Sequence, residues 1–160
     1  MEETLKTSLF LDDTRTPKQP APGFMPWKVV RNFDQFTEII FKFHSLFGKL
    51  PDLISFDHDL HDEHLIDYTT YEAQGIPAIH YDEFKEKTGF ECAAWLCDFC
   101  ELNDLELPLC GVHSQRPLGA KNIHELLNRF KASRGQVPDA YIQQVPSFTA
   151  HELGERLAGN

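Results

Sequence analysis

The sequence predicts an α/β fold: a three-layer sandwich with a mostly parallel central sheet. Short apolar runs of strand-forming residues alternate with longer segments whose apolar residues recur every three or four positions. This alternation is typical of parallel sheets, in which helices connect successive strands. With 160 residues, 41% of them hydrophobic, the chain can bury the core of one domain. We therefore interpret residues 1–160 as a single domain.

The first half of the chain contains three predicted strands and one predicted helix. Residues 8–11 (SLFL) and 27–31 (WKVVR) are strand-like, and the proline-rich stretch 14–26 between them predicts an irregular loop. Residues 33–47 carry phenylalanine and isoleucine at three- and four-residue spacing, which predicts a helix. The apolar residues 53–56 of PDLISF predict a third, buried strand.

The second half begins with a long polar connection. Residues 61–88 show no clear periodicity, and a connection of this length within one domain is usually functional or disordered, so we interpret it as a lid inserted over the strand ends. Thr88 and Glu91 form a predicted capping box for an almost wholly apolar helix from Gly89 to about Asn103. The remaining predicted elements are a strand at 107–112, a helix at about 119–133, a strand at 140–145 and a short helix at 149–157.

Three of the predicted strands are followed directly by polar residues. The carboxyl ends of strands in an open α/β sheet form the edge at which such folds bind ligands, so these residues suggest one site. We predict a metal site for Mg²⁺ or Mn²⁺ there, because both ions prefer carboxylate oxygens. The predicted metal ligands are Asp12, Asp13 and Asp57, with Asp59 as a further candidate.

Histidines and arginines near these strand ends could handle a phosphate. His58 and His113 are candidates for general acid and base, because imidazole titrates near neutral pH; the alternative is that one of them only orients a buried carboxylate. Arg15, Arg31 and Arg116 are candidate phosphate contacts, because a guanidinium group matches phosphate oxygens in pairs. The alternative for each arginine is a salt bridge within the protein.

Other histidines and the cysteines are less informative. His61 and His64 follow His58 at three-residue spacing, which would suit zinc, but residues after a strand end need not share a face. We therefore expect His61 and His64 to be solvated residues of the lid. The cysteines, which lack the second close pair that a zinc site usually has, are expected to be buried, reduced thiols: Cys92, Cys97, Cys100 and Cys110.

Composition excludes several classes of partner. The formal net charge of −10 argues against general DNA or RNA binding, but not against a nucleotide or RNA end held through a divalent cation. No apolar stretch approaches the ~20 residues that span a bilayer, and MEETLKTS lacks the features of a signal peptide. We therefore expect a cytoplasmic location, no membrane partner, and a phosphorylated small molecule or RNA end as the ligand.

The strand-end residues resemble those of the receiver domain of response regulators. On this resemblance Asp12 and Asp13 are the metal-binding pair, Asp57 stands in the place of the phosphoacceptor aspartate, and Ser114 in that of the hydroxyl residue that contacts the phosphoryl group. The chain departs from the pattern in three ways. A proline-rich loop replaces the helix between the first two strands, and no lysine closes the strand predicted at 140–145. In addition, His58 and Asp59 follow Asp57, and His113 precedes Ser114.

With these departures, the sequence resembles a divergent group of receiver-like domains, the cyclic-phosphate processing receiver-like domains. Its pattern is LFLDD-x-R-x-P, W-x-V-V-R, D-x-I-S-x-D-H-D-L, a helix with a tryptophan, and H-S-x-N-P-x-G. The chain carries LFLDDTRTP, WKVVR, DLISFDHDL, CAAWL and HSQRPLG in the same order, with Arg116 in the place of the asparagine. The resemblance implies a receiver- or flavodoxin-like fold and a metal-dependent phosphoesterase that acts on a cyclic phosphate of a nucleotide or RNA end.

Two other functions fit part of the pattern. One is a receiver domain that is phosphorylated at Asp57 and read by a partner; the absent lysine and the added His58 and His113 weigh against it. The other is a non-catalytic module that senses a nucleotide. On the enzyme hypothesis, Asp57, His58, His113 and Ser114 are the predicted catalytic residues.

Overall fold

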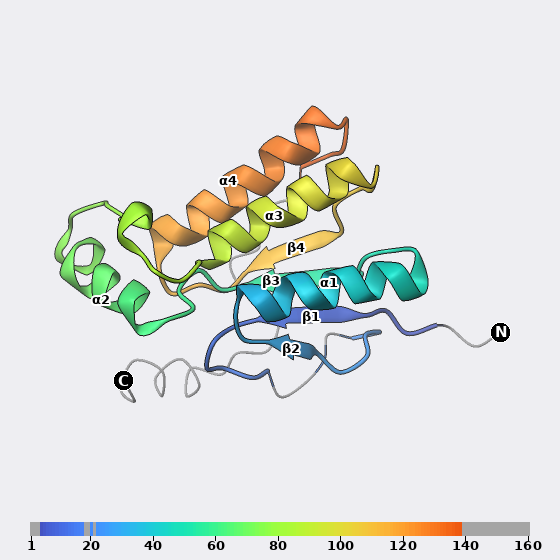
Figure 1. Ribbon diagram of the computed structural model, residues 1–160, viewed down its shortest axis with the longest axis horizontal. Helices are drawn as coiled ribbons and strands as arrows, with labels where there is room; N and C mark the ends of the chain where they lie inside the picture. Colours follow the sequence, from blue (N-terminus) through green and yellow to red (C-terminus); the bar gives the residue numbers. More distant parts are fainter. Residues whose placement is uncertain (1–3, 18–19, 21, 139–160) are drawn as a thin grey trace.

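A computed structural model describes residues 4–17, 20 and 22–138 of the chain. Its centre is a four-stranded sheet whose neighbouring strands are all parallel (Figure 1). The strands lie in the order β2 (Lys28–Val30), β1 (Ser8–Leu11), β3 (Leu53–Phe56) and β4 (Leu109–Val112). The predicted α/β fold with a parallel sheet is therefore confirmed, and the strand predicted at 140–145 and the helix predicted at 149–157 lie outside the described residues.

Within the described residues, three long helices accompany the sheet. They are α1 (Phe33–Phe47), α3 (Gly89–Leu102) and α4 (Pro117–Ser133), and their bounds agree with the predicted helices to within about two residues. The predicted capping box at the start of α3 is present: the Thr88 side chain accepts from the helix backbone, and the Glu91 carboxylate accepts from the backbone of Thr88. Local sequence therefore sets where this helix begins.

One face of the sheet forms a continuous core with these helices. Leu9, Leu11, Ile54 and Phe56 alternate along β1 and β3, and they pack in one cluster with buried apolar residues of α1, α3 and α4. Since successive side chains of a strand point to opposite faces, the residues between and after them point away from these helices.

Strand register brings the polar residues to the same level. Phe10 of β1 lies beside Ser55 of β3, which in turn lies beside Gly111 of β4. Two residues further along each strand are Asp12, Asp57 and His113, which therefore leave the sheet on the same face. The backbone confirms this level, because the Asp57 N–H donates to the Leu11 carbonyl and the His113 N–H donates to the Phe56 carbonyl, both at 2.9 Å.

The segment 61–88 lies beyond the carboxyl ends of the strands, at the left of Figure 1. It contains a helix, α2 (Asp62–Thr70), and two 3₁₀ turns, Glu72–Gln74 and Tyr81–Glu83. The sequence did not predict α2, because its buried residues are polar, His64 and Asp67, and therefore leave no apolar periodicity. We call residues 61–88 the lid.

His64 is buried, so the expectation of a solvated side chain is wrong. Its Nδ1 accepts from the Leu60 backbone N–H, and its Nε2 donates to the Glu86 carbonyl, both at 2.9 Å. Burial lowers the pKa of His64, and the contact at Nδ1, which accepts a hydrogen bond, requires the neutral ring. His64 therefore ties the start of the lid to its end.

The cysteines behave as small buried hydrophobes. All four are buried and none forms a disulfide, as the sequence predicts. Burial raises the pKa of the Cys97 thiol to about 12 and that of Cys100 to about 11, so these thiols stay protonated at neutral pH. None of the helices described here is long and apolar enough to cross a membrane.

Candidate functional site

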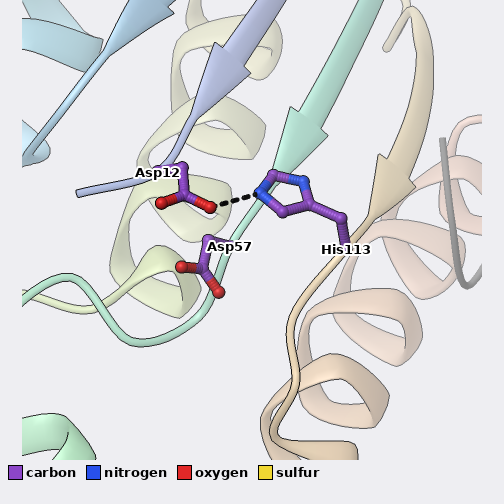
Figure 2. A group of neighbouring side chains, drawn as sticks. All are labelled: Asp12, Asp57 and His113. Atoms are coloured by element: carbon purple, nitrogen blue, oxygen red, sulfur yellow. Dashed lines mark hydrogen bonds and ion pairs between the residues drawn. The ribbon is translucent and has the colours of Figure 1, made fainter. Parts of the chain in front are cut away.

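Asp12, Asp57 and His113 converge at the carboxyl ends of β1, β3 and β4 (Figure 2). One side-chain ligand atom from each residue lies within 4.8 Å of the other two, and all three residues are buried. The convergence follows from the register, since the three residues leave neighbouring strands at the same level and on the same face. We call these three residues the strand-end cluster.

Arg15 links the two carboxylates of the cluster. The Asp12 Oδ1 accepts from the backbone N–H groups of Thr14 (2.9 Å) and Arg15 (2.7 Å), and its Oδ2 accepts from the Nε of Arg15 at 2.8 Å. The Nη2 of Arg15 lies 3.7 Å from the Asp57 Oδ2 and donates to the His113 carbonyl at 3.3 Å. One buried cation thus offsets part of the repulsion between two buried carboxylates.

The His113 ring is fixed by three neighbours. It stacks on Phe10 with 4.2 Å between ring centroids and 7° between planes. Its Nε2 lies 3.1 Å from the Asp12 Oδ2, and its Nδ1 lies 2.6 Å from the Ser55 Oγ. Burial lowers the pKa of His113 despite the neighbouring Asp12 carboxylate, which favours the neutral imidazole.

The donor set of the cluster fits a divalent metal ion. Two carboxylate oxygens and a neutral imidazole nitrogen are common ligands of such ions, and Asp12 and Asp57 carry the opposite charge. Ligands that occupy neighbouring positions of an octahedral ion with bonds of about 2.1 Å lie about 3 Å apart. The Asp12 Oδ2 and the His113 Nε2 lie 3.1 Å apart, at present as hydrogen-bond partners, and all three ligand atoms lie within 4.8 Å of one another.

Asp13 and Asp59, the other predicted metal ligands, are not members of the three-residue cluster found among the described residues. Asp13 is half-buried, next to Asp12 on the loop after β1. The Asp59 Oδ1 instead lies 2.7 Å from the Nδ1 of His58. The structure therefore places two of the four predicted carboxylates at the strand-end cluster.

His58 does not have the surroundings of His113, although both were predicted to act on one phosphate. Its ring is fully buried between the lid and α4. Its Nδ1 contacts Asp59, its Nε2 lies 2.9 Å from the Tyr81 hydroxyl, and a Cβ added at Gly119 of α4 would collide with the ring. His58 thus forms a chain of hydrogen bonds with Asp59 and Tyr81.

Arg116 holds the lid rather than facing the cluster. Its side chain is fully buried, and its guanidinium pairs with Asp67 at 2.6 Å, Glu72 at 3.2 Å and Asp59 at 3.5 Å. The same group donates to the carbonyls of His64 at 3.2 Å and Ala78 at 3.0 Å. Arg116 therefore makes the internal salt bridges considered as its alternative role, and it also lines the pocket beside Asp57, so its role as a phosphate contact stays a prediction.

Arg31 also makes contacts within the protein. Its Nη1 donates to the carbonyls of Asp12 (3.0 Å) and Arg15 (2.6 Å), and its Nη2 donates to the Thr16 hydroxyl at 2.6 Å. Arg31 therefore supports the loop that carries Asp12 and Arg15. Of the three predicted phosphate contacts, Arg15 is the one that reaches the strand-end cluster.

A small pocket opens beside Asp57. Asp59, Ser114 and Arg116 line it near the strand ends, and Leu65 and Tyr68 line it from α2 of the lid. The Ser114 Oγ also accepts from the Arg116 backbone N–H at 3.1 Å, which orders the turn before α4. A ligand in this pocket would contact Asp57 on one side and the lid on the other.

The comparison with known families agrees with these features. Residues 7–129 match the family described as "Cyclic-phosphate processing Receiver domain". The chain belongs to this family. The matched range contains the four strands found in the described residues and the lid, so the receiver-like fold and the association with cyclic-phosphate processing are family properties of this chain. Searches of curated proteins and of solved structures each gave no significant match.

Several residues that contact the site or the lid of this receiver domain were not predicted from the sequence. Ser55 and Phe10 were read only as strand residues, although each lies two positions before a site aspartate and therefore on the same face. That two-residue offset could have identified them. Asp67 and Tyr81 lie in the lid, where no pattern in the sequence indicated their partners.

Proposed function

We propose that this receiver domain is a divalent-metal-dependent phosphoesterase that hydrolyses a cyclic phosphate of a nucleotide or RNA end. The observation that carries the proposal is the convergence of Asp12, Asp57 and His113 in a member of a cyclic-phosphate processing family. Mg²⁺ or Mn²⁺ held by these residues would neutralise phosphate oxygens and stabilise the charge that develops during phosphoryl transfer. The pocket beside Asp57 has a volume of about 10 Å³, room for about one water molecule, so a phosphate would bind there only after the lid moves aside.

Arg15 and Ser114 support binding in this proposal. Arg15 is a buried cation that keeps Asp12 and Asp57 close together despite their like charges. Ser114 lines the pocket and offers a hydroxyl beside Asp57, which suits a phosphate oxygen. The lid closes the other side of the pocket and limits access of bulk water.

Asp59 and His58 are the proposed acid–base pair. Asp59 lines the pocket, and the ring of His58 holds its carboxylate at 2.7 Å. Asp59 would remove a proton from a water molecule as its oxygen bonds to phosphorus. The sugar oxygen, released on the opposite side of phosphorus when the ring P–O bond breaks, would take a proton from solvent, and Asp59 would give its proton to solvent. The product is a phosphate monoester with a free hydroxyl, and Asp59 returns to its starting state.

The test is a screen of cyclic mononucleotides and of RNA with a terminal cyclic phosphate, each with Mg²⁺ and Mn²⁺. We expect the parent to produce monoesters and Asp57→Asn to produce none. Asp62→Asn, which removes an exposed carboxylate of the lid, is the matched control and should retain activity.

Incubation with acetyl phosphate and Mg²⁺ tests the alternative of a phosphorylated receiver. A stable mass gain on Asp57, together with no hydrolysis of any cyclic phosphate, would contradict the proposal. Specific nucleotide binding without turnover would instead support a sensing module.

A further inference from the structure

Ser55 has a contact that the proposed function leaves unexplained. It is fully buried in β3, and its Oγ lies 2.6 Å from the Nδ1 of His113. On the other side of the ring, the Nε2 of His113 faces Asp12, and the ring plane lies on Phe10. The ring therefore presents Nε2 to the strand-end cluster and Nδ1 to the Ser55 hydroxyl group.

We infer that Ser55 is a positioning residue that holds the Nε2 of His113 ready to bind a divalent metal ion, and that the site consequently prefers a first-row transition ion such as Mn²⁺ to Mg²⁺. The inference rests on the metal site of the proposed function. It adds a residue outside that site and a choice between two ions.

A hydroxyl group suits both hydrogen-bonding states of His113. A carboxylate only accepts, so the contact with Asp12 places the proton of the neutral ring on Nε2, and Nδ1 then accepts from the Ser55 hydroxyl. When Nε2 binds a metal ion, the ring proton must lie on Nδ1, and the same hydroxyl then accepts it. The Nε2 proton leaves to solvent and Nδ1 takes a proton from solvent, so the ring stays neutral and Ser55 keeps its hydroxyl proton.

The preference for a transition ion follows from the ligand types. Imidazole nitrogen suits Zn²⁺, Fe²⁺ and other transition ions, whereas Mg²⁺ prefers oxygen ligands and keeps much of its water. Mn²⁺ accepts the oxygens of Asp12 and Asp57 and binds nitrogen more readily than Mg²⁺ does. The Phe10 and Ser55 contacts also fix the direction of Nε2 before an ion arrives, which reduces the ordering that binding requires.

Isothermal titration of the full chain with MnCl₂ and with MgCl₂, without substrate, tests the inference. We expect the parent to bind Mn²⁺ more tightly than Mg²⁺, and Ser55→Ala to weaken Mn²⁺ binding by about 10–100-fold, the usual effect of losing a hydrogen bond to a ligating histidine. Ser55→Thr keeps the hydroxyl and should restore most of the affinity. Ser8→Ala removes another buried strand hydroxyl, one without a contact to His113 in the structure, and should match the parent.

Two further measurements exclude a merely structural effect. His113→Asn should bring Mn²⁺ and Mg²⁺ affinities close together, because it removes the nitrogen ligand. In ¹⁵N-labelled protein bound to Zn²⁺, which is diamagnetic, the His113 ring signals should show a proton on Nδ1. Thermal unfolding without metal checks that each variant folds; should Ser55→Ala not fold, Ser55→Cys, with its weaker hydrogen-bonding group, replaces it with the same expected direction.

Equal Mn²⁺ affinity in the parent and in Ser55→Ala would overturn the inference. So would a parent that binds Mg²⁺ as tightly as Mn²⁺, or that binds neither ion. The first two outcomes leave the proposed function standing, because a site that binds either ion can still support hydrolysis, whereas a parent that binds neither ion would contradict both the inference and the proposed function. A parent that prefers Mn²⁺ through Ser55 but hydrolyses no cyclic phosphate would contradict only the proposed function.

Discussion

Arg116→Met should strongly destabilise the attachment of the lid. The substitution keeps an apolar side chain of similar length but removes the guanidinium group that pairs with Asp59, Asp67 and Glu72. These three carboxylates are at least 89% buried, since their side chains are 8%, 6% and 11% exposed respectively. Without Arg116, three negative charges remain close together in a region that water reaches poorly.

The expected loss is about 3–5 kcal/mol, the range found when one partner of a buried ion pair is removed. Burial alone would raise the pKa of Asp67, but hydrogen bonds from Arg116 and His80 outweigh it and lower the pKa, so the charged form is the one that the fold stabilises. In the variant, partial protonation of the carboxylates would relieve some of the repulsion, so the loss should be smaller at acid pH than at neutral pH.

Urea unfolding and hydrogen exchange of residues 61–88 measure the effect. Lys121→Met is the matched control on the same helix, because Lys121 is 67% exposed and its pair with Glu125 spans 3.9 Å, so its loss should change stability by less than about 1 kcal/mol. An Arg116→Met variant with parental stability and parental lid protection, but with weakened phosphate binding, would refute this reasoning. It would support the role of Arg116 as a phosphate contact.

Three other changes test separate parts of the account. Asp57→Asn should abolish metal-dependent turnover, while circular dichroism and thermal unfolding without metal show a fold at least as stable as the parent's, because one of two close carboxylates is neutralised. The pKa of His64 lies below its ordinary value of 6.5, so the unfolded chain binds a proton more readily than the folded one. The free energy of unfolding should therefore fall as the pH drops below about 6.5. Urea titrations of His64→Gln should show a weaker dependence of this free energy on pH in the same range. Gly119→Ala should destabilise by about 1–3 kcal/mol in urea unfolding, because the new methyl group would collide with the His58 ring; unchanged stability would contradict the packing of His58 against α4.

The sequence was sufficient for the sheet and the long helices. Residues 53–56 and 33–47 became β3 and α1 with the predicted bounds, since apolar periodicity and caps are local properties that a sequence displays. The close approach of Asp12 to Asp57 was predictable for a related reason. Parallel strands bring their carboxyl ends to one edge, whatever their separation along the chain.

The lid could not be predicted in the same way. Its helix α2 turns His64 and Asp67 inward, and their partners, Glu86 and Arg116, lie 22 and 49 residues away in the sequence. A buried ion pair of this kind depends on where two distant segments meet, and neither segment carries a periodic apolar pattern. The contacts of Arg116 with the lid could therefore be identified only from the structure.

The site itself was predicted in part. Asp12, Asp57 and His113 were predicted as site residues because each directly follows a strand. The sequence did not show which of them binds a metal ion and which acts as an acid or base. That distinction depends on ring orientation: His113 turns toward Asp12, whereas His58, next to Asp57 in sequence, turns toward Asp59 and Tyr81. The orientations of the two rings are set by packing against Phe10, Ser55 and α4. Periodicity in the sequence carries no information about such packing.

The most direct test of the account is a crystal structure of the protein grown with MnCl₂, with anomalous diffraction used to locate the ion. We expect one strong anomalous peak at about 2.0–2.4 Å from a carboxylate oxygen of Asp12, a carboxylate oxygen of Asp57 and the Nε2 of His113. Soaking with Mg²⁺ should weaken the peak by competition only at much higher concentration. A map with no peak at this cluster, or with the ion bound instead by Asp13 or Asp59, would contradict the central claim.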